Sequence, residues 1–249
     1  MFDIDSVRLL IFGLAIVPAI FGIIMHEVAH GWVAFKHGDP TAKFLGRLTL
    51  NPIRHVDPMG LGVFIFTALF SPFIIGWAKP VPVQPRYFKK PRQAMMLVSA
   101  AGPITNFIVA LFCALLARAM ANMMDAGLVG GSSAVGMVNS FLRYGFQGPQ
   151  DIAVLVLLSA ILGIFINCAL AWFNLMPVPP LDGSHILEGL LPRSLAIQYA
   201  SLGRFGMLII ILLVAVGAFR YVLVPLIDMS ASFMLSFTGI DPAISRRFF

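Results

Sequence analysis

One apolar stretch, residues 9–35, decides the fold, and it reads LLIFGLAIVPAIFGIIMHEVAHGWVAF. Glu27 is its only residue with a formal charge at pH 7 when histidine is neutral. An α-helix rises about 1.5 Å per residue, so about 20 apolar residues cross the hydrocarbon core of a bilayer, which is about 30 Å thick. The stretch is therefore long enough to form a membrane-spanning helix.

Three further apolar stretches have a similar length, and we predict a membrane span in each: residues 94–120, 152–173 and 205–226. Residues 61–76 are also apolar, but this stretch is shorter and contains Pro72, which interrupts a helix. The pattern predicts an all-α polytopic membrane protein with about four transmembrane helices, or as many as five or six. Between the first two spans we expect a re-entrant or short β element.

The composition indicates that lipid surrounds the protein. Of the 249 residues, 59% are apolar and 11% are charged, whereas a soluble domain carries about 25% charged residues. A protein surface that faces water needs more charged residues than this chain has. We therefore expect the lipid bilayer to contact most of the chain. Residues 79–85, which read KPVPVQP, carry proline at alternate positions and are predicted to be extended.

The positive charges are concentrated between the first two predicted spans. Residues 36–92 contain nine Lys and Arg against two Asp, whereas Arg143 is the only basic residue in 121–151. By the positive-inside rule the first connection is cytoplasmic and the second is external. Since no binding motif of interleaved aromatic and basic residues accompanies the charge, the net charge of +6 indicates membrane topology and no nucleic-acid partner.

The motif HEVAH at residues 26–30 lies inside the first predicted span. Positions i and i+4 share one face of a helix, so His26 and His30 can bind one metal ion while Glu27 reaches a water on that metal. Zinc lowers the pKa of such a water to about 7, and a carboxylate can then act as general base. A chance pattern is a poor explanation in a chain with five His; a metal site that has lost catalysis is the other alternative.

A hydrolytic zinc site takes a third ligand from the protein, and topology favours Asp182. Asp182 and His26 both lie near the cytoplasmic end of a predicted span, at a similar depth. The run 177–180 before Asp182 has three prolines, so its backbone is extended and survives at membrane depth only beside protein or a water-filled cavity. The alternative is that Asp182 caps a helix that begins near Ser184.

Four motifs resemble the site-2 protease family of intramembrane metalloproteases. In chain order they are HEVAH at 26–30, NPIRHVDPMG at 51–60, GPITN at 102–106 and NLMPVPPLDG at 174–183. The sequence shows neither a PDZ nor a CBS domain, so it is similar to the compact members of the family. The resemblance implies one membrane-embedded metalloprotease domain over residues 1–249, with a catalytic core at about 8–192 and a C-terminal span and tail at about 203–249.

The same resemblance implies roles for individual residues. His26, His30 and Asp182 would bind one Zn²⁺ per chain, and Glu27 would activate the water. Asn106 is a candidate for orienting the substrate or stabilising the oxyanion, although an amide there could equally form a hydrogen bond between helices. His55, within the second motif, either contacts the site or satisfies a surface turn.

The expected function is therefore that of a zinc metalloendopeptidase. The resemblance implies that it cleaves a transmembrane segment of another membrane protein, towards the cytoplasmic side of a bacterial plasma membrane. Two alternatives belong to other classes of function. One is a catalytically silent scaffold that binds transmembrane helices, which would have no need of Glu27. The other is a metal transporter, for which several polar residues along a path and paired halves would be expected.

Overall fold

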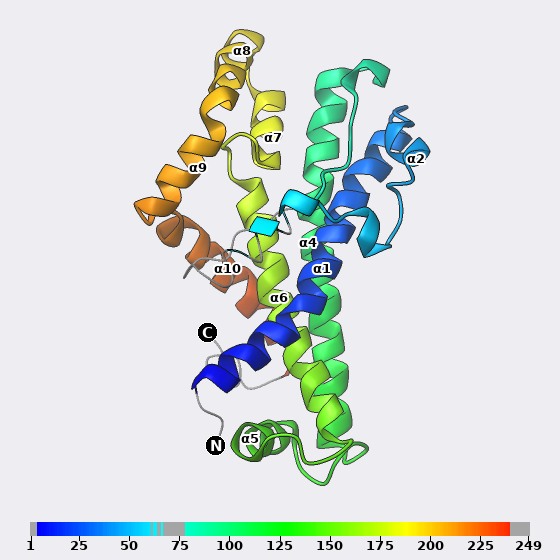
Figure 1. Ribbon diagram of the computed structural model, residues 1–249, viewed down its shortest axis with the longest axis vertical. Helices are drawn as coiled ribbons and strands as arrows, with labels where there is room; N and C mark the ends of the chain where they lie inside the picture. The colour runs from blue at the N-terminus through cyan, green and yellow to red at the C-terminus, as the bar shows by residue number, and fades with distance from the viewer. Residues whose placement is uncertain (1–3, 61, 64–65, 67–77, 240–249) are drawn as a thin grey trace. The chain divides into compact units, whose positions relative to one another are not determined.

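The computed structural model describes residues 4–60, 62–63, 66 and 78–239, and within these ranges the chain is mainly helical (Figure 1). The elements in chain order are α1 (Ile4–Lys36), α2 (Thr41–Phe44), η1 (Pro52–Arg54), η2 (Pro85–Tyr87), α4 (Pro91–Asp125), α5 (Ala134–Tyr144), α6 (Asp151–Leu175), α7 (Asp182–Leu190), α8 (Arg193–Ser201), η3 (Leu202–Phe205), α9 (Gly206–Ala215) and α10 (Ala218–Ser236). The described ranges contain no β-strand, only an isolated antiparallel bridge between Val56 and Ala78. The all-α prediction is confirmed.

Five helical segments of the described chain are long and apolar enough to cross a membrane: Leu9–Lys36, Pro91–Asp125, Asp151–Leu175, Arg193–Ala215 and Ala218–Ser236. The first three correspond to α1, α4 and α6, and each contains one of the predicted spans. These helices extend beyond the apolar stretches because polar residues at their ends continue the same backbone hydrogen bonding. The prediction of a polytopic membrane protein is confirmed.

The predicted single span over residues 205–226 is wrong. α9 ends at Ala215 and α10 begins at Ala218, and Gly217 between them has a φ of 70°. A left-handed backbone ends a helix, and glycine adopts it without steric cost. Because the residues on both sides of Gly217 are apolar, the sequence gives no sign that one candidate span ends here and another begins.

The connection between the first two spans is described only in part. Residues 79–84 are free of helix, as their prolines predict, and η2 begins at Pro85. The predicted re-entrant segment, residues 61–76, lies almost wholly outside the described residues, and so do residues 240–249.

Contacts within the chain group it into two compact units. The first unit comprises Met1–Gly22, Asn106–Trp172 and Gly217–Phe249, and the second comprises Ile23–Thr105 and Phe173–Val216. The single catalytic domain over residues 1–249 stays a prediction.

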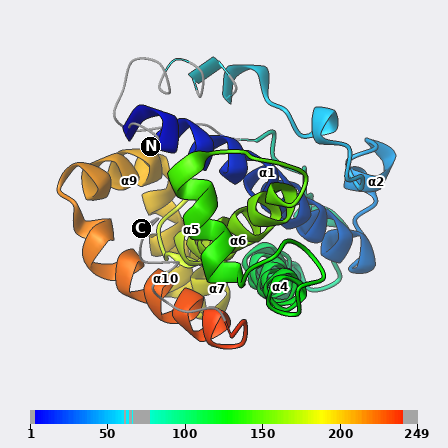
Figure 2. The ribbon, with the colours of Figure 1, turned by 90° about the horizontal axis from the view of Figure 1, so that it is seen from below.

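In the first unit, α4 and α6 run side by side, and the N-terminal part of α1 diverges from them (Figures 1 and 2). The hydroxyl of Ser159 donates to the carbonyl of Leu14 at 2.9 Å. A Cβ added to Gly163 would lie 3.0 Å from Pro18 Cβ and 2.7 Å from Cys113 Sγ. A glycine in α6 therefore lets both neighbouring helices approach its backbone.

In the second unit, hydrogen bonds join the end of α7 to the start of α4. The Arg92 guanidinium donates to the carbonyl of Glu188 at 2.8 Å and also to the carbonyl of Leu191. These carbonyls lie at the end of α7, where the helix leaves acceptors without partners of its own. A Cβ added to Gly189 would come within 2.9 Å of Met96 Cβ, so the two helices are in close contact here.

Candidate active site

α1 places two histidines of the HEVAH motif against each other in the second unit. The rings of His26 and His30 meet edge to face, with centroids 4.5 Å apart and an interplanar angle of 86°. Their Nε2 atoms are 2.9 Å apart, and both residues are buried. This contact follows from the helical period, which puts positions i and i+4 one above the other.

Asp182, the first residue of α7, completes the cluster. Its Oδ2 lies 3.1 Å from His26 Nε2 and 3.3 Å from His30 Nε2. The alternative in which Asp182 caps the helix is not what the structure shows, because Leu181 takes the capping position and Asp182 is already the first helical residue. The Ser184 amide donates instead to the carbonyl of Leu181 at 2.9 Å.

Two glycines of the sequence motifs permit this arrangement. A Cβ on Gly102 would lie 2.5 Å from His30 Nε2 and 2.6 Å from His26 Nε2, so α4 approaches the imidazoles with bare backbone. A Cβ on Gly183 would lie 2.1 Å from the carbonyl oxygen of Leu175, where α7 turns back against the end of α6. The sequence identified both glycines as parts of motifs but did not indicate that they make room for the site.

A backbone carbonyl selects the tautomer of His30. Its Nδ1 lies 2.7 Å from the oxygen of Val98. A carbonyl can only accept a hydrogen bond, so Nδ1 carries the proton and the neutral ring has its lone pair on Nε2. Val98 was not predicted as part of the site, because nothing in the sequence marks a main-chain oxygen as a partner of an imidazole.

These donor atoms fit a metal ion. The ligand atoms of His26, His30 and Asp182 all lie within 4.8 Å of one another. Two ligands on a tetrahedral zinc ion, each about 2.0–2.1 Å from it, are about 3.3–3.4 Å apart, close to the separations found here. Asp182 Oδ2 is buried and has no hydrogen-bond partner of good geometry among the described residues. Buried polar atoms that converge in this way are unfavourable unless hydrogen bonds or a cation satisfy them.

The charge of Asp182 suits this environment. Burial by itself raises the pKa of its carboxyl, but polar contact with His26 and then His30 outweighs burial and lowers the pKa to about 2. The carboxylate therefore stays ionised at any physiological pH. An anionic oxygen is the form that binds a metal.

Glu27 is held by the extended segment that precedes α4. Its Oε2 accepts a hydrogen bond of 2.7 Å from the backbone amide of Val81. Glu27 is half-buried, and Val81 is buried. One of the two carboxylate oxygens of the predicted base is therefore held by a backbone donor.

Asn106 lies in the first unit and is fully buried. Its Nδ2 donates to the carbonyl of Gly22 at 3.2 Å and to Asn167 Oδ1 at 3.0 Å. The amide therefore joins α1, α4 and α6, which is the helix-to-helix hydrogen bond that the sequence left open. A role for Asn106 in orienting substrate stays a prediction. Asn167 was missed, although an amide in an otherwise apolar span was a signal for it.

His55 takes part in the fold of the connection. Its Nε2 contacts the carbonyl oxygen of Thr49 at 2.8 Å, and its own carbonyl accepts from the Lys79 amide at 2.9 Å. These contacts favour the reading in which His55 satisfies a turn.

Comparison with known proteins agrees with this chemistry. The model of the family described as Peptidase family M50 matches residues 14–214. The chain is 37% identical over 216 residues to "Putative zinc metalloprotease YwhC" of Bacillus subtilis, covering 86% of this chain and 85% of that protein. It is 28% identical over 221 residues to "Putative zinc metalloprotease Rip2" of Mycolicibacterium smegmatis, covering 86% and 73%.

No solved structure matches the chain significantly. The family match covers most of the chain and includes all four motifs on which the resemblance rests. The chain therefore belongs to peptidase family M50, the site-2 protease family, and is a metalloprotease built as a polytopic membrane protein.

Proposed function

We propose that this chain is an intramembrane zinc endopeptidase that hydrolyses a peptide bond in or near a transmembrane segment of another membrane protein. One observation carries the proposal: the ligand atoms of His26, His30 and Asp182 converge on one point, and two of the three belong to a candidate membrane span. Ionisable residues inside a span are costly and mark function.

The same three side chains would hold one Zn²⁺ per chain. Two imidazole nitrogens and one carboxylate oxygen are a common donor set for a catalytic zinc, which keeps a further position open. The names of the relatives in Bacillus and Mycolicibacterium support zinc over other divalent ions. A bound zinc would supply a Lewis acid and make a water nucleophilic near neutral pH.

Glu27 would act as the general base. Its carboxylate takes a proton from the attacking water and delivers that proton to the nitrogen of the leaving amine, so the peptide bond breaks with no net change in charge. Asp182 stays ionised throughout and keeps the two imidazoles oriented. The Nδ1–H of His30 keeps donating to the carbonyl oxygen of Val98, which fixes the orientation of the ring.

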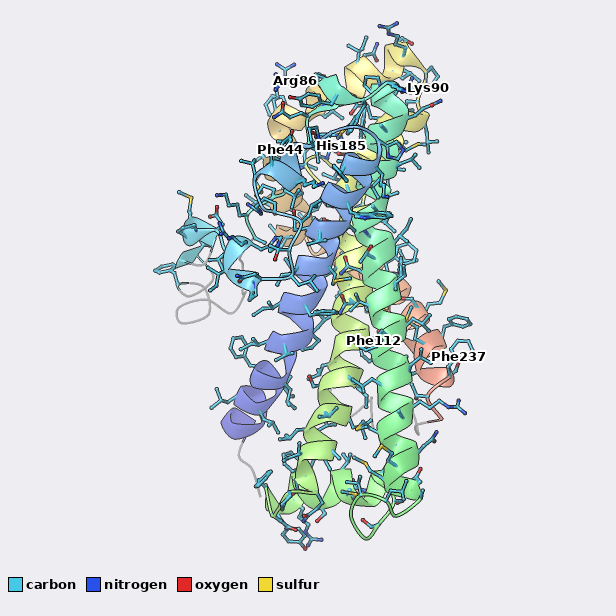
Figure 3. The ribbon with its side chains drawn as sticks, turned by 90° about the vertical axis from the view of Figure 1, so that its right-hand side faces the viewer. Phe44, Arg86, Lys90, Phe112, His185 and Phe237 are labelled. Carbon is cyan, nitrogen blue, oxygen red and sulfur yellow. The ribbon has the colours of Figure 1, made fainter. Side chains whose placement is uncertain are left out.

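The location of the site supports a membrane-embedded substrate at the cytoplasmic side. The HEVAH motif lies within the candidate span Leu9–Lys36. Arg86 and Lys90 belong to the basic connection, and they lie with His185 of α7 at the same end of the second unit (Figure 3). Because positive residues are retained on the cytoplasmic side, we place the site towards the cytoplasm. The relatives come from bacteria, which supports the bacterial plasma membrane.

The test combines zinc content with cleavage. The purified protein in detergent is compared with Glu27→Gln, using single-span membrane proteins that carry a fluorescent domain on each side as substrates. A panel with different apolar segments is screened first with the parent. We expect Glu27→Gln to keep its zinc and to lose cleavage by about 10²–10⁴-fold, the usual contribution of a general base. Glu188→Gln is the matched control, since Glu188 is a half-exposed carboxylate of α7 that pairs with His185.

Each outcome has one meaning. Cleavage that survives in Glu27→Gln at the parent rate contradicts the assignment of the base. A parent that binds segments of the panel but cuts none of them, with or without added zinc, contradicts the protease function and favours the scaffold. Zinc uptake into sealed vesicles that contain the parent would favour the transporter.

A further inference from the structure

The segment Lys79–Gln84 is docked on the face of α1 that carries Glu27. A Cβ added to Gly31 would lie 2.9 Å from Val81 Cγ1 and 2.7 Å from Leu48 Cδ2, so the chain passes directly over this glycine. Gly31 and Glu27 are four residues apart and share one side of the helix. The absence of a side chain at position 31 therefore allows the backbone of Val81 to reach the carboxylate of Glu27.

The segment is also anchored on both sides of Val81. The Lys79 amide donates to the carbonyl of His55 at 2.9 Å, and the Lys79 carbonyl accepts from Arg47 at 2.5 Å. At the other end the Gln84 amide donates to Asp39 Oδ2 at 2.6 Å, and Asp39 is fully buried. The position of the Val81 amide is thus set by contacts that do not involve Glu27.

The prolines leave one donor at this point. Pro80 and Pro82 have no N–H and a fixed φ, so Val81 supplies the only backbone donor of residues 80–82. That donor is committed to Glu27 Oε2 at 2.7 Å. The next amide, that of Val83, finds no partner in the part of the chain that the structure describes.

We propose that the backbone amide of Val81 is a positioning group for Glu27. It binds Oε2 and leaves Oε1 to exchange the proton of the reaction. This inference rests on the proposed role of Glu27 as base. A glutamate side chain on a helix otherwise samples several rotamers, and a reacting group displaced by about 1 Å can cost about 10²-fold in rate. A charge-assisted hydrogen bond is among the stronger ways to restrict it.

The sharpest test removes only the N–H. Incorporation of the α-hydroxy analogue of valine at position 81 replaces the amide by an ester, and Val81→Pro removes the same donor with standard genetics. Val81→Ala keeps the donor and loses the buried side chain, so it measures how much of any loss comes from packing. Val83→Pro removes an amide that has no partner in the described chain. Cleavage is measured with the fluorescent single-span protein that the parent cuts best, together with zinc content and unfolding temperature.

We expect the ester and Val81→Pro to lower kcat by about 10–100-fold with KM and zinc content unchanged, while Val83→Pro keeps the parent kcat. A structural role would lower the unfolding temperature or zinc content of the ester as well. The inference is overturned if the ester has the parent kcat. It is equally overturned if the ester raises kcat, because the amide would then be blocking the base.

A second readout needs no metal and no substrate. In protein with ¹⁵N-valine, the peak of the Val81 amide is assigned by its absence in Val81→Ala. We expect it to exchange slowly with deuterium in the metal-free parent and quickly in Glu27→Ala, with Glu188→Ala as control. Fast exchange in the parent would contradict the hydrogen bond. If Glu27→Gln cleaves normally, the proposed role of Glu27 as base fails whatever this exchange shows; if only the ester behaves like the parent, the inference about Val81 alone fails.

Discussion

His26 Nε2 and His30 Nε2 face each other across 2.9 Å, and Asp182 Oδ2 lies within 3.3 Å of both. Two segments more than 150 residues apart in sequence thus contribute to one cluster. The contact between the rings comes from one turn of α1, whereas the contact with the carboxylate depends on how α7 is attached to its neighbours.

Replacement of Asp182 by Asn tests the third ligand with little change in shape. The amide cannot supply an anionic oxygen, so we expect zinc affinity to fall by more than about 100-fold, beyond the usual effect of a residue behind the ligands. Zinc retained against a chelator is measured by mass spectrometry. Asp228→Asn, which changes an exposed residue of α10, is the control. An Asp182→Asn protein with the parent affinity would place the third ligand elsewhere.

Gly102→Ala tests the close approach of α4 to the imidazoles. The added Cβ would lie within 2.6 Å of both rings, so we expect the histidines to be displaced and zinc to be lost. Gly13→Ala in α1 is the matched control, because a Cβ there meets no described atom within 4 Å. That change should instead stabilise the helix by about 0.5–1 kcal/mol. Full zinc content in Gly102→Ala would show that the backbone of α4 lies farther from the two imidazoles than this structure places it.

Asp39→Asn tests the anchor of the extended segment. Its carboxylate accepts from the Thr41 amide at 2.9 Å and from the Gln84 amide at 2.6 Å, and it is fully buried. Loss of a charged acceptor at a buried site costs about 1–3 kcal/mol, so we expect a lower unfolding temperature in detergent. Asp57→Asn serves for comparison, since Asp57 is less buried and accepts from the Gly60 amide. An equal effect of the two changes would argue against a special role for Asp39.

The pKa of Asp182 leads to a pH dependence in metal-free protein. The value is lowered from 3.8 to about 2. A carboxyl with a lower pKa in the folded chain stabilises the fold above its unfolded pKa, and this contribution is lost as the pH falls through the folded pKa. We therefore expect the parent to unfold at a higher temperature than Asp182→Asn at pH 5, and the difference to shrink between about pH 4 and pH 2. A difference that grows on acidification would contradict the shift.

Asn106→Ala and Asn167→Ala test the hydrogen bond between two buried amides. Asn106 Nδ2 donates to Asn167 Oδ1 at 3.0 Å, and it also donates to the carbonyl of Gly22 at 3.2 Å. Each change should cost about 1–3 kcal/mol, because each leaves a buried partner unpaired. The double variant should cost clearly less than the sum of the two. Additive losses would show that the amides act independently. Loss of kcat in Asn106→Ala alone, with normal stability, would favour the predicted catalytic role.

Local patterns made the helices and part of the site predictable. His26 and His30 are placed by helical spacing alone, and apolar length was enough for α1, α4 and α6. The close contacts of Gly102 and the carbonyl of Val98 were not predictable, because they depend on where α4 passes α1 in space. The break at Gly217 was missed for a different reason, since apolar residues on both sides of a left-handed glycine give a continuous pattern.

The attachment of Arg92 to the end of α7 bears on how a substrate enters. Because α7 begins with Asp182 and its last carbonyls are bound by α4, a swing of α7 away from α4 would both expose those acceptors and pull the carboxylate from the imidazoles. Admission of a substrate by that route would separate Asp182 from the two histidines with which we propose that it binds zinc. We therefore expect α4 and the helix that starts at Asp182 to move together as a rigid unit during turnover. The path by which the substrate enters should then open between other elements.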